Sequence, residues 1–234
     1  MTKREPPRQL ALDLPVEEGH DAEDFLVSPS NEAAYAAVEA WPDWPDRVLL
    51  LIGPPGSGKT HCAAIWAARA HAWTLPRARL RAEDVPRLVS SGALVVEDCD
   101  RASGHEDALF HLLNLARERG AWVLLTARTP ASDWGLATPD LLSRLRLAPS
   151  AVLGEPDDAL LRAVLVKHFV ERQLIVDTSV VEFLCARLER SMGAVREVVD
   201  ALDRAGLERG RRITRPLAGE ILRSLESRGA PDRA

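Results

Sequence analysis

The sequence predicts an α/β fold in which a parallel sheet lies between two layers of helices, followed by a small all-helical domain. In the first two thirds of the chain, short and uninterrupted apolar runs alternate with amphipathic segments, which is typical of a parallel sheet covered on both faces. After Gly154-Glu155-Pro156 the strand-like runs stop. Four helical segments are expected there, at about residues 157–171, 177–190, 193–209 and 215–227.

The strands of the sheet are expected at four apolar runs, residues 47–52, 94–96, 122–125 and, with a weaker pattern, 151–153. These runs are rich in Val, Leu and Ile, as suits short strands that are buried on both faces. The segments 58–70 and 107–119 are expected to be crossover helices. The run Trp41-Pro42-Asp43-Trp44-Pro45 before the first strand is expected to pack at the sheet edge.

We expect three parts in the chain. Residues 1–24 combine Pro, Glu, Asp and Arg around one short apolar motif, a composition too polar to pack alone, and are expected to form a flexible tail. The α/β domain is expected at residues 25–153 and the helical domain at residues 154–234. An apolar segment of the kind found in a signal peptide or a membrane span is absent, so no membrane partner is expected.

The composition restricts the class of protein. With 234 residues, 46% of them apolar, the chain can bury one full core and a second, smaller one. A net charge of −5 supplies no general field for nucleic acid, so direct DNA contact is expected to be weak or indirect. The cysteines, Cys62, Cys99 and Cys185, lack paired spacing, which argues against disulfides and zinc and for a reducing, cytoplasmic compartment.

A phosphate-binding loop is predicted between the first strand and the first crossover helix. The pattern G-x-x-x-x-G-K-[ST] is matched at every fixed position by Gly53-Pro54-Pro55-Gly56-Ser57-Gly58-Lys59-Thr60. Glycines let backbone N–H groups turn toward phosphates, and the following helix N-terminus adds partial positive charge. Lys59 is expected to neutralise the β- and γ-phosphates and Thr60 to ligate Mg²⁺. ADP or ATP with Mg²⁺ is therefore the expected cofactor.

An acidic partner for the metal is expected at the end of the next strand. Glu97 and Asp98 follow the run at 94–96; Glu97 would lie on the metal side, and Asp98 would polarise the attacking water. Thr126, at the end of the following strand, is placed to contact the γ-phosphate or that water. The alternative interpretations are an ordinary acidic turn and a threonine that serves strand packing alone.

Two arginines complete a pattern that resembles the AAA+ ATPases. Arg144 lies near the end of a helical stretch before the last strand, and Arg196 lies near the start of the third C-terminal helix. In AAA+ proteins one arginine reaches the nucleotide of a neighbouring subunit, and another, on the helical lid, contacts the nucleotide of its own subunit. The resemblance implies that Arg144 is the arginine finger and Arg196 the lid sensor. Each could instead be an ordinary surface arginine.

Within the AAA+ proteins, residues 25–227 resemble the DnaA family of bacterial replication proteins. The resemblance is carried by Phe25-Leu26-Val27 with Asn31, Leu125-Thr126-Ala127-Arg128, Ser143-Arg144-Leu145, and Arg196-Glu197 with Leu202 and Arg204. It implies that Phe25, Val27 and Asn31 lie where the family holds adenine.

The chain is shorter than a DnaA initiator at two places. It ends at Ala234, soon after the lid, so the C-terminal DNA-binding domain of an initiator is not expected. The distance from Lys59 to Glu97 is also short, which leaves little room for the single-strand-binding segment. This shorter form resembles the Hda-like regulators that switch DnaA off.

The predicted tail contains a second recognisable motif. Residues 9–15, Gln9-Leu10-Ala11-Leu12-Asp13-Leu14-Pro15, resemble the peptide by which Hda-like regulators and several polymerases bind the sliding clamp. An extended peptide of this kind can hydrogen-bond at a pocket rim through its glutamine and bury leucines in the pocket. The expected contact residues are Gln9, Leu10, Leu12 and Leu14. Docking of these leucines on the protein's own core is the alternative.

Together these features predict a negative regulator of replication initiation. The resemblance implies that it binds the sliding clamp, the β subunit of DNA polymerase III, and stimulates hydrolysis of DnaA-bound ATP through Arg144. Weak intrinsic turnover is expected, because Glu97 stands where the family usually has Asp and Ala127 where initiators carry a polar residue. An autonomous, DNA-stimulated ATPase of the helicase-loader type and a non-enzymatic adaptor are the alternatives, and a homodimer is left open.

Overall fold

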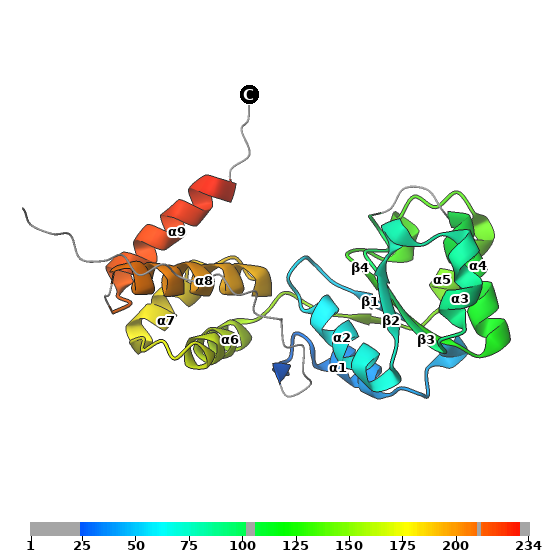
Figure 1. The fold of residues 1–234 in the computed structure, drawn as a ribbon, viewed down its shortest axis with the longest axis horizontal. Coiled ribbons are helices and arrows are strands. Elements are labelled where there is room, and N and C mark those ends of the chain that lie inside the picture. The colour runs from blue at the N-terminus through cyan, green and yellow to red at the C-terminus, as the bar shows by residue number, and fades with distance from the viewer. Residues whose placement is uncertain (1–23, 102–105, 210–211, 230–234) are drawn as a thin grey trace, which may run out of the picture. The chain divides into compact units, whose positions relative to one another are not determined.

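The computed structural model describes residues 24–101, 106–209 and 212–229. The described chain divides into two compact units, an α/β unit that ends at Asp157 and a helical unit that begins at Asp158 (Figure 1). The proposed clamp-binding residues Gln9, Leu10, Leu12 and Leu14 lie outside the described residues. Within the described ranges, no helix combines the length and the apolar character needed to cross a membrane.

The sheet of the α/β unit is parallel, with the strand order β2-β3-β4-β1-β5. The strands are β1 (Val48–Ile52), β2 (Trp73–Pro76), β3 (Ala93–Glu97), β4 (Trp122–Ala127) and β5 (Ser150–Val152). Four of them lie at the predicted apolar runs. The sequence analysis missed β2, because this edge strand has only four residues, is half-exposed and ends in a proline.

Helices cover both faces of the sheet, as predicted (Figure 1). On one face, α1 (Glu32–Glu39) and α2 (Lys59–Ala70) pack on a core that includes Leu49 and Leu51 of β1. The other face holds Leu50 and Ile52, and it is covered by α3 (Val85–Val89), α4 (Glu106–Arg119) and α5 (Pro139–Leu147). Adjacent residues of β1 are thus buried on opposite faces, which explains why the strand is apolar throughout.

The tryptophan-rich run before β1 packs at the amino ends of the central strands. Trp44 is 5% exposed, and its ring centroid lies 4.9 Å from that of Trp66 and 6.1 Å from that of Trp122. Trp122 begins β4, which pairs with β1 in the middle of the sheet. The packing role predicted for this run is correct, but its place is the amino-terminal end of β1 and β4 and not the sheet edge.

The helical unit contains α6 (Asp158–Glu171), α7 (Thr178–Cys185), α8 (Met192–Arg209) and α9 (Arg215–Gly229). Leu165, Leu184, Val199 and Leu202 lie in its core and are fully buried. The segment predicted as a helix at 177–190 is shorter, because regular helix ends at Cys185 and a turn follows. In the part of the chain that the structure describes, four helices follow the parallel sheet, which confirms the predicted fold class.

Candidate nucleotide-binding site

The predicted phosphate loop connects the carboxyl end of β1 to the amino end of α2. Gly56 and Gly58 have φ angles of 71° and 98°, which favour glycine. A Cβ atom on Gly53 would lie 2.5 Å from the Leu153 carbonyl oxygen and 2.7 Å from Ser57 Oγ, so that position also excludes a side chain. Between these glycines, Pro54 is half-buried and Pro55 is exposed. Three of the motif's glycines are thus required by the backbone that the loop adopts.

Two polar side chains make the loop suited to an anion. Lys59 Nζ donates to the carbonyl oxygens of Gly53, at 2.7 Å, and Pro54, at 2.9 Å. Burial lowers the pKa of Lys59, and the nearby Arg128 lowers it further, against the raising effect of the acidic residues beside it. Ser57 Oγ is buried and has no hydrogen-bond partner in the described structure. A buried hydroxyl in need of a partner and a half-buried ammonium fit a phosphate group.

The metal-binding part of the prediction rests on Thr60 and Glu97. Thr60 is the second residue of α2 and is exposed, so its hydroxyl is accessible. Glu97 is the last residue of β3 and is partly buried. Among the residues that the structure describes, no three His, Cys, Asp or Glu side chains are grouped as metal ligands. A Mg²⁺ ion at this site would therefore depend on phosphate oxygens and water for most of its ligands.

The acidic turn after β3 is held in place by Thr126. The backbone turns at Asp98, whose φ angle is 55°. Thr126, 2% exposed, accepts two bonds there: its Oγ1 from the Asp98 N–H at 3.2 Å and its carbonyl from the Cys99 N–H at 2.8 Å. The Asp98 carboxylate is half-exposed and lies 3.7 Å from the Arg101 guanidinium. The structure therefore brings Asp98 and Thr126 together, and Thr126 orders the turn as well as packing in the strand.

Arg77 is a further residue of this turn that the sequence analysis missed. It follows β2, is only 2% exposed, and donates from Nη1 to the carbonyl oxygen of Cys99. Its Nε and Nη2 atoms are buried, and no described residue accepts from them. Because β2 pairs with β3 and Pro76 lies beside Glu97, the residue after β2 must fall beside the acidic turn. Arg77 could have been identified from the sequence if β2 had been recognised as a strand.

The segment before α1 lies against the start of the phosphate-loop helix. The Phe25 ring stacks on Tyr35, with centroids 5.0 Å apart, and meets His61 of α2 edge-on at 5.3 Å. Val27 is 51% exposed. Asn31 is buried: its Oδ1 accepts from the Ser28 N–H at 2.8 Å and its Nδ2 donates to the Leu26 carbonyl at 2.9 Å. Asn31 thus shapes the segment that presents Phe25 and Val27.

The two arginines of the prediction lie in different units. Arg144 belongs to α5 of the α/β unit and is partly buried, with its guanidinium carbon 5.5 Å from the centroid of the Phe110 ring on α4. Arg196 belongs to α8 of the helical unit and is also partly buried. The role of each toward a nucleotide stays a prediction.

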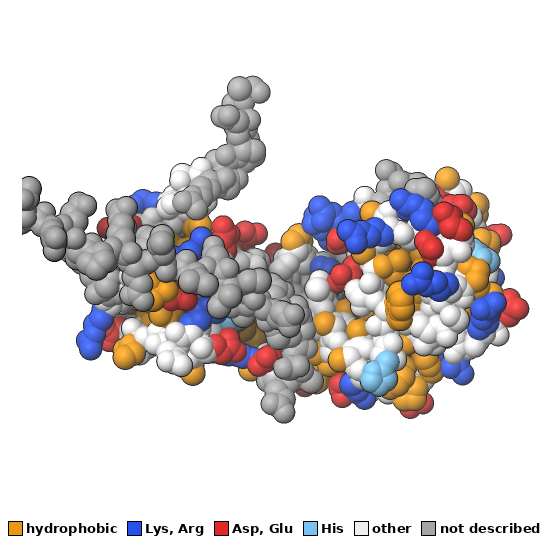
Figure 2. All heavy atoms as spheres, viewed as in Figure 1, with side chains coloured by type: hydrophobic (Ala, Val, Ile, Leu, Met, Phe, Trp, Pro, Cys, Tyr) orange, Lys and Arg blue, Asp and Glu red, His pale blue; other side chains and the backbone are white. Residues whose placement is uncertain are grey.

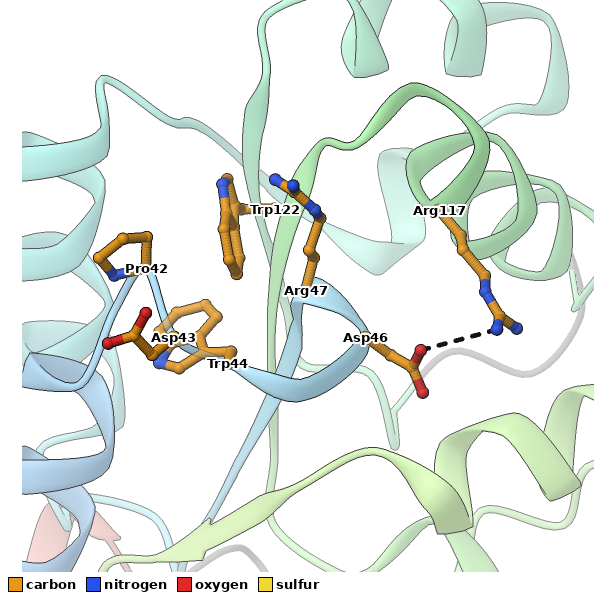
Figure 3. Close-up of a pocket in the computed structure, with 7 residues that line it drawn as sticks. All are labelled: Pro42, Asp43, Trp44, Asp46, Arg47, Arg117 and Trp122. Carbon is orange, nitrogen blue, oxygen red and sulfur yellow. Dashed lines mark ion pairs between the residues drawn. The ribbon is translucent and has the colours of Figure 1, made fainter.

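A pocket of about 410 Å³ lies away from the phosphate loop, at the amino end of the sheet (Figure 3). Arg47 lies over the Trp122 ring, 4.6 Å from its centroid, and donates to the Gly120 carbonyl at 2.9 Å. Arg117 and Asp46, both exposed, form an ion pair at 3.7 Å on the other side of the pocket. These charged groups already have partners within the chain.

Charges of both signs are mixed on the visible face of the α/β unit. Figure 2 shows Lys and Arg side chains close to Asp and Glu side chains over this face. This distribution gives no support to a basic stripe for nucleic acid on the face shown.

Comparisons with known proteins agree with the fold and the order of the motifs. Residues 157–222 match the family described as the Hda lid domain. The chromosomal replication initiator protein DnaA of Thermomicrobium roseum is 27% identical over 264 residues. That match covers 97% of this chain and 55% of that protein, so the chain spans about half the length of this relative.

Solved structures of DnaA share the fold. Domain III of the Thermotoga maritima replication initiation protein DnaA has a TM-score of 0.73 at 18% identity, over 90% of this chain and 98% of that chain. AMPPCP-bound DnaA from Aquifex aeolicus has a TM-score of 0.68 at 16% identity, over 91% of this chain and 70% of that chain. The chain is therefore similar in sequence to DnaA over most of its length, shares the fold of DnaA domain III, and carries a segment at residues 157–222 that matches the Hda lid domain.

Proposed function

We propose that this chain is a regulator of replication initiation that promotes hydrolysis of ATP bound to DnaA. The observation that carries the proposal is the placement of Arg144. Its guanidinium is partly buried over the Phe110 ring, near the end of α5, in a chain whose lid matches that of Hda. An arginine held in this way has restricted motion and can be offered to the nucleotide of a neighbouring subunit.

The chain's own nucleotide acts mainly as a conformational ligand in this proposal. The loop from Gly53 to Thr60 would hold its phosphates, with Lys59 as the neutralising cation and Glu97 near the metal. Phe25, Val27 and Arg196 would contact the rest of the nucleotide. When bound, ADP or ATP with Mg²⁺ supplies the negative phosphate charge that Lys59 and Arg196 would neutralise. Asp98, which would polarise the attacking water, lies 3.7 Å from the Arg101 guanidinium.

Arg144 would act on a nucleotide that the partner holds. In phosphoryl transfer, negative charge spreads over the oxygens of the transferred group, and a guanidinium placed beside them stabilises that charge. An arginine supplied by a partner protein in this way contributes about 10³- to 10⁵-fold in rate. The nucleophile and the metal for this reaction belong to DnaA, so this chain contributes only electrostatic stabilisation.

The sliding clamp is the second proposed partner. Gln9, Leu10, Leu12 and Leu14 would bind it as an extended peptide. This link would restrict the stimulation of DnaA to places in the cytoplasm where clamp is loaded on DNA.

The test of the proposed function is the rate at which DnaA-bound ATP is hydrolysed in the presence of clamp loaded on DNA. We expect Arg144→Ala to lower the stimulated rate at least ~10³-fold, while Arg146→Ala, an exposed arginine on the same helix, retains it. Equal stimulation by Arg144→Ala and the unmodified protein would contradict the proposal. DNA-stimulated turnover by this chain alone, without clamp or DnaA, would favour an autonomous ATPase of the helicase-loader type instead.

The clamp is tested separately. A pull-down with the clamp should retain the unmodified protein and lose the double variant Leu12→Ala/Leu14→Ala, because the leucines are the residues expected to fill the apolar pocket. Equal retention of both proteins would contradict clamp binding through these leucines. The proposed role of Arg144 would not be affected.

A further inference from the structure

We propose that Glu106 and Phe110, which lie one turn apart on α4, are positioning residues that fix α5 and the Arg144 guanidinium. The inference rests on the proposed function, because it takes Arg144 as the residue that acts on the partner's nucleotide. The feature that motivates it is a pair of contacts from α4 to α5, one at the start of α5 and one at Arg144 itself.

The first contact is a carboxylate that caps α5 from another helix. Glu106 Oε1 accepts a hydrogen bond from the Ala137 N–H at 2.9 Å, and Oε2 accepts one from the Thr138 N–H at 2.8 Å. Thr138 is the residue before α5, and its own side chain does not cap the helix. The N–H groups of the two residues that lead into α5 are therefore bound by a residue that lies about thirty positions earlier in the sequence.

The electrostatic surroundings keep Glu106 ionised. It is the first residue of α4, so its carboxylate lies at the amino ends of two helices, α4 and α5. Helix amino ends favour negative charge. The pKa of Glu106 is lowered chiefly by the hydrogen bond from the Ala137 N–H, with further contributions from Thr138 and from the charge of Arg77. Two charge-assisted hydrogen bonds thus join the two helices at neutral pH.

The second contact is the stacking of Arg144 on Phe110. Phe110 lies four residues after Glu106, which places both side chains on the same face of α4. Its ring is partly buried against the core on that side of the sheet, and the Arg144 guanidinium carbon is 5.5 Å from the ring centroid. A guanidinium over a ring face is attracted by the ring and loses rotamer freedom. The ring therefore restricts the direction in which Arg144 extends.

Together the two contacts fix the position of α5 and the direction of the Arg144 side chain. Glu106 fixes the start of α5, and Phe110 fixes the guanidinium near its end. Effective catalysis by a positioned group depends on placement within about 1 Å, and misplacement on that scale can cost about 10²-fold in rate. Loss of either contact should lower the rate of the stimulated reaction without removing Arg144 and without weakening the encounter between the two proteins.

The experiment measures hydrolysis of DnaA-bound ATP with clamp loaded on DNA, as a function of the concentration of this chain. Glu106→Ala and Phe110→Leu are each expected to lower the maximal rate about tenfold and to leave the half-saturating concentration unchanged. Glu106→Gln keeps one acceptor oxygen and Phe110→Tyr keeps the ring, so both should restore most of the rate.

Matched controls come from the helical unit. Glu182 accepts two hydrogen bonds from Arg162, and the Phe183 ring lies 4.1 Å from the Arg187 guanidinium carbon. Glu182→Ala therefore removes a carboxylate with two hydrogen bonds and Phe183→Leu removes a ring beside a guanidinium, both in the helical unit, and both variants should keep the unmodified rate. A general loss of stability would lower the rate of the controls as well.

A second readout does not depend on activity. In the isolated chain, amide hydrogen exchange at Ala137 and Thr138 should accelerate about tenfold or more in Glu106→Ala and change little in Phe110→Leu. If Arg144→Ala abolishes stimulation but Glu106→Ala and Phe110→Leu match the unmodified protein, the inference is overturned and the proposed function stands. If Arg144→Ala has no effect, the proposed function fails, and unchanged exchange at Ala137 in Glu106→Ala would then overturn the capping role as well.

Discussion

The two ends of the central sheet are built from different kinds of side chain. At the carboxyl ends of β1, β3 and β4, the chain places glycines, a half-buried lysine and a buried hydroxyl that lacks a partner in the described structure. At the amino ends of β1 and β4 it places the rings of Trp44, Trp66 and Trp122, which pack against one another. The same strands therefore support an open polar loop at one end and a closed aromatic cluster at the other.

Within this single unit, the residues that bind a ligand and the residues that stabilise the fold thus lie at opposite ends of the same strands. Ligand sites in open α/β sheets lie at the carboxyl ends of the strands, where side chains need not fill the core. The aromatic end buries large rings and contributes to the free energy of unfolding. Substitutions at the aromatic end should therefore change stability, and substitutions at the phosphate loop should change nucleotide affinity.

The largest loss of stability is expected at the aromatic end of the sheet. Trp66 is fully buried between the sheet and the rings around it, so Trp66→Ala should lower the free energy of unfolding by about 3–5 kcal/mol. Trp73, which is 51% exposed on the edge strand, is the control, and Trp73→Ala should cost less than about 1 kcal/mol. Denaturant unfolding measures both. Equal costs for the two variants would contradict the packing described here.

A smaller effect, of another kind, is expected at the phosphate loop. Lys59→Ala should weaken nucleotide binding by about 10- to 100-fold, because it removes charge-assisted hydrogen bonds worth about 1.5–3 kcal/mol. Isothermal titration with ADP measures the affinity. Unfolding of the nucleotide-free protein should change by less than about 0.5 kcal/mol. A large loss of stability with intact affinity would reverse the proposed division between the two ends.

At the pocket near the amino end of the sheet, Arg47→Ala is expected to lower the free energy of unfolding by about 1 kcal/mol. Arg47 stacks on Trp122 and donates to Gly120, so Arg47→Ala removes one cation–π contact and one hydrogen bond. Arg117→Ala removes only an exposed ion pair and should cost less than about 0.5 kcal/mol. If thermal unfolding ranks the two variants in the opposite order, the stacking of Arg47 is not what stabilises this loop.

The smallest effect is a pH dependence at Glu106. Its pKa is lowered in the folded protein, so its contribution to stability is present above the unfolded pKa of about 4.3 and is lost as the pH falls through the folded value. The difference in melting temperature between the unmodified protein and Glu106→Gln should therefore be largest near neutral pH and shrink below about pH 4. A difference that grows on acidification would contradict the sign of the shift.

The strands and crossover helices of the α/β unit could be predicted because their signals are local. β1 is a continuous apolar run, and the glycines of the loop after it match a pattern that the backbone geometry requires. The edge strand β2 could not be predicted in this way, since two of its four residues are exposed, the other two are only partly buried, and its apolar signal is weak. With β2 missing, Arg77 had no predicted position.

The site residues whose roles depend on distant partners were the hardest to interpret. Asn31 has partners close in sequence: its side-chain hydrogen bonds shape the segment from Leu26 to Ser28, and its role at adenine stays a prediction. The bond from Ala137 to Glu106 joins residues 31 positions apart, and no local pattern marks it. Arg128 was quoted only as part of a motif, although its charge lies near enough to Lys59 to lower the pKa of that lysine.

The most direct test of the central claim asks whose ATP is hydrolysed. DnaA is loaded with ATP labelled on the γ-phosphate, this chain is loaded with unlabelled ADP, and the two are mixed with clamp on DNA in a single turnover. We expect rapid release of labelled phosphate with the unmodified chain and almost none with Arg144→Ala. Slow release that is equal with both proteins would contradict a role for Arg144 at the partner's nucleotide.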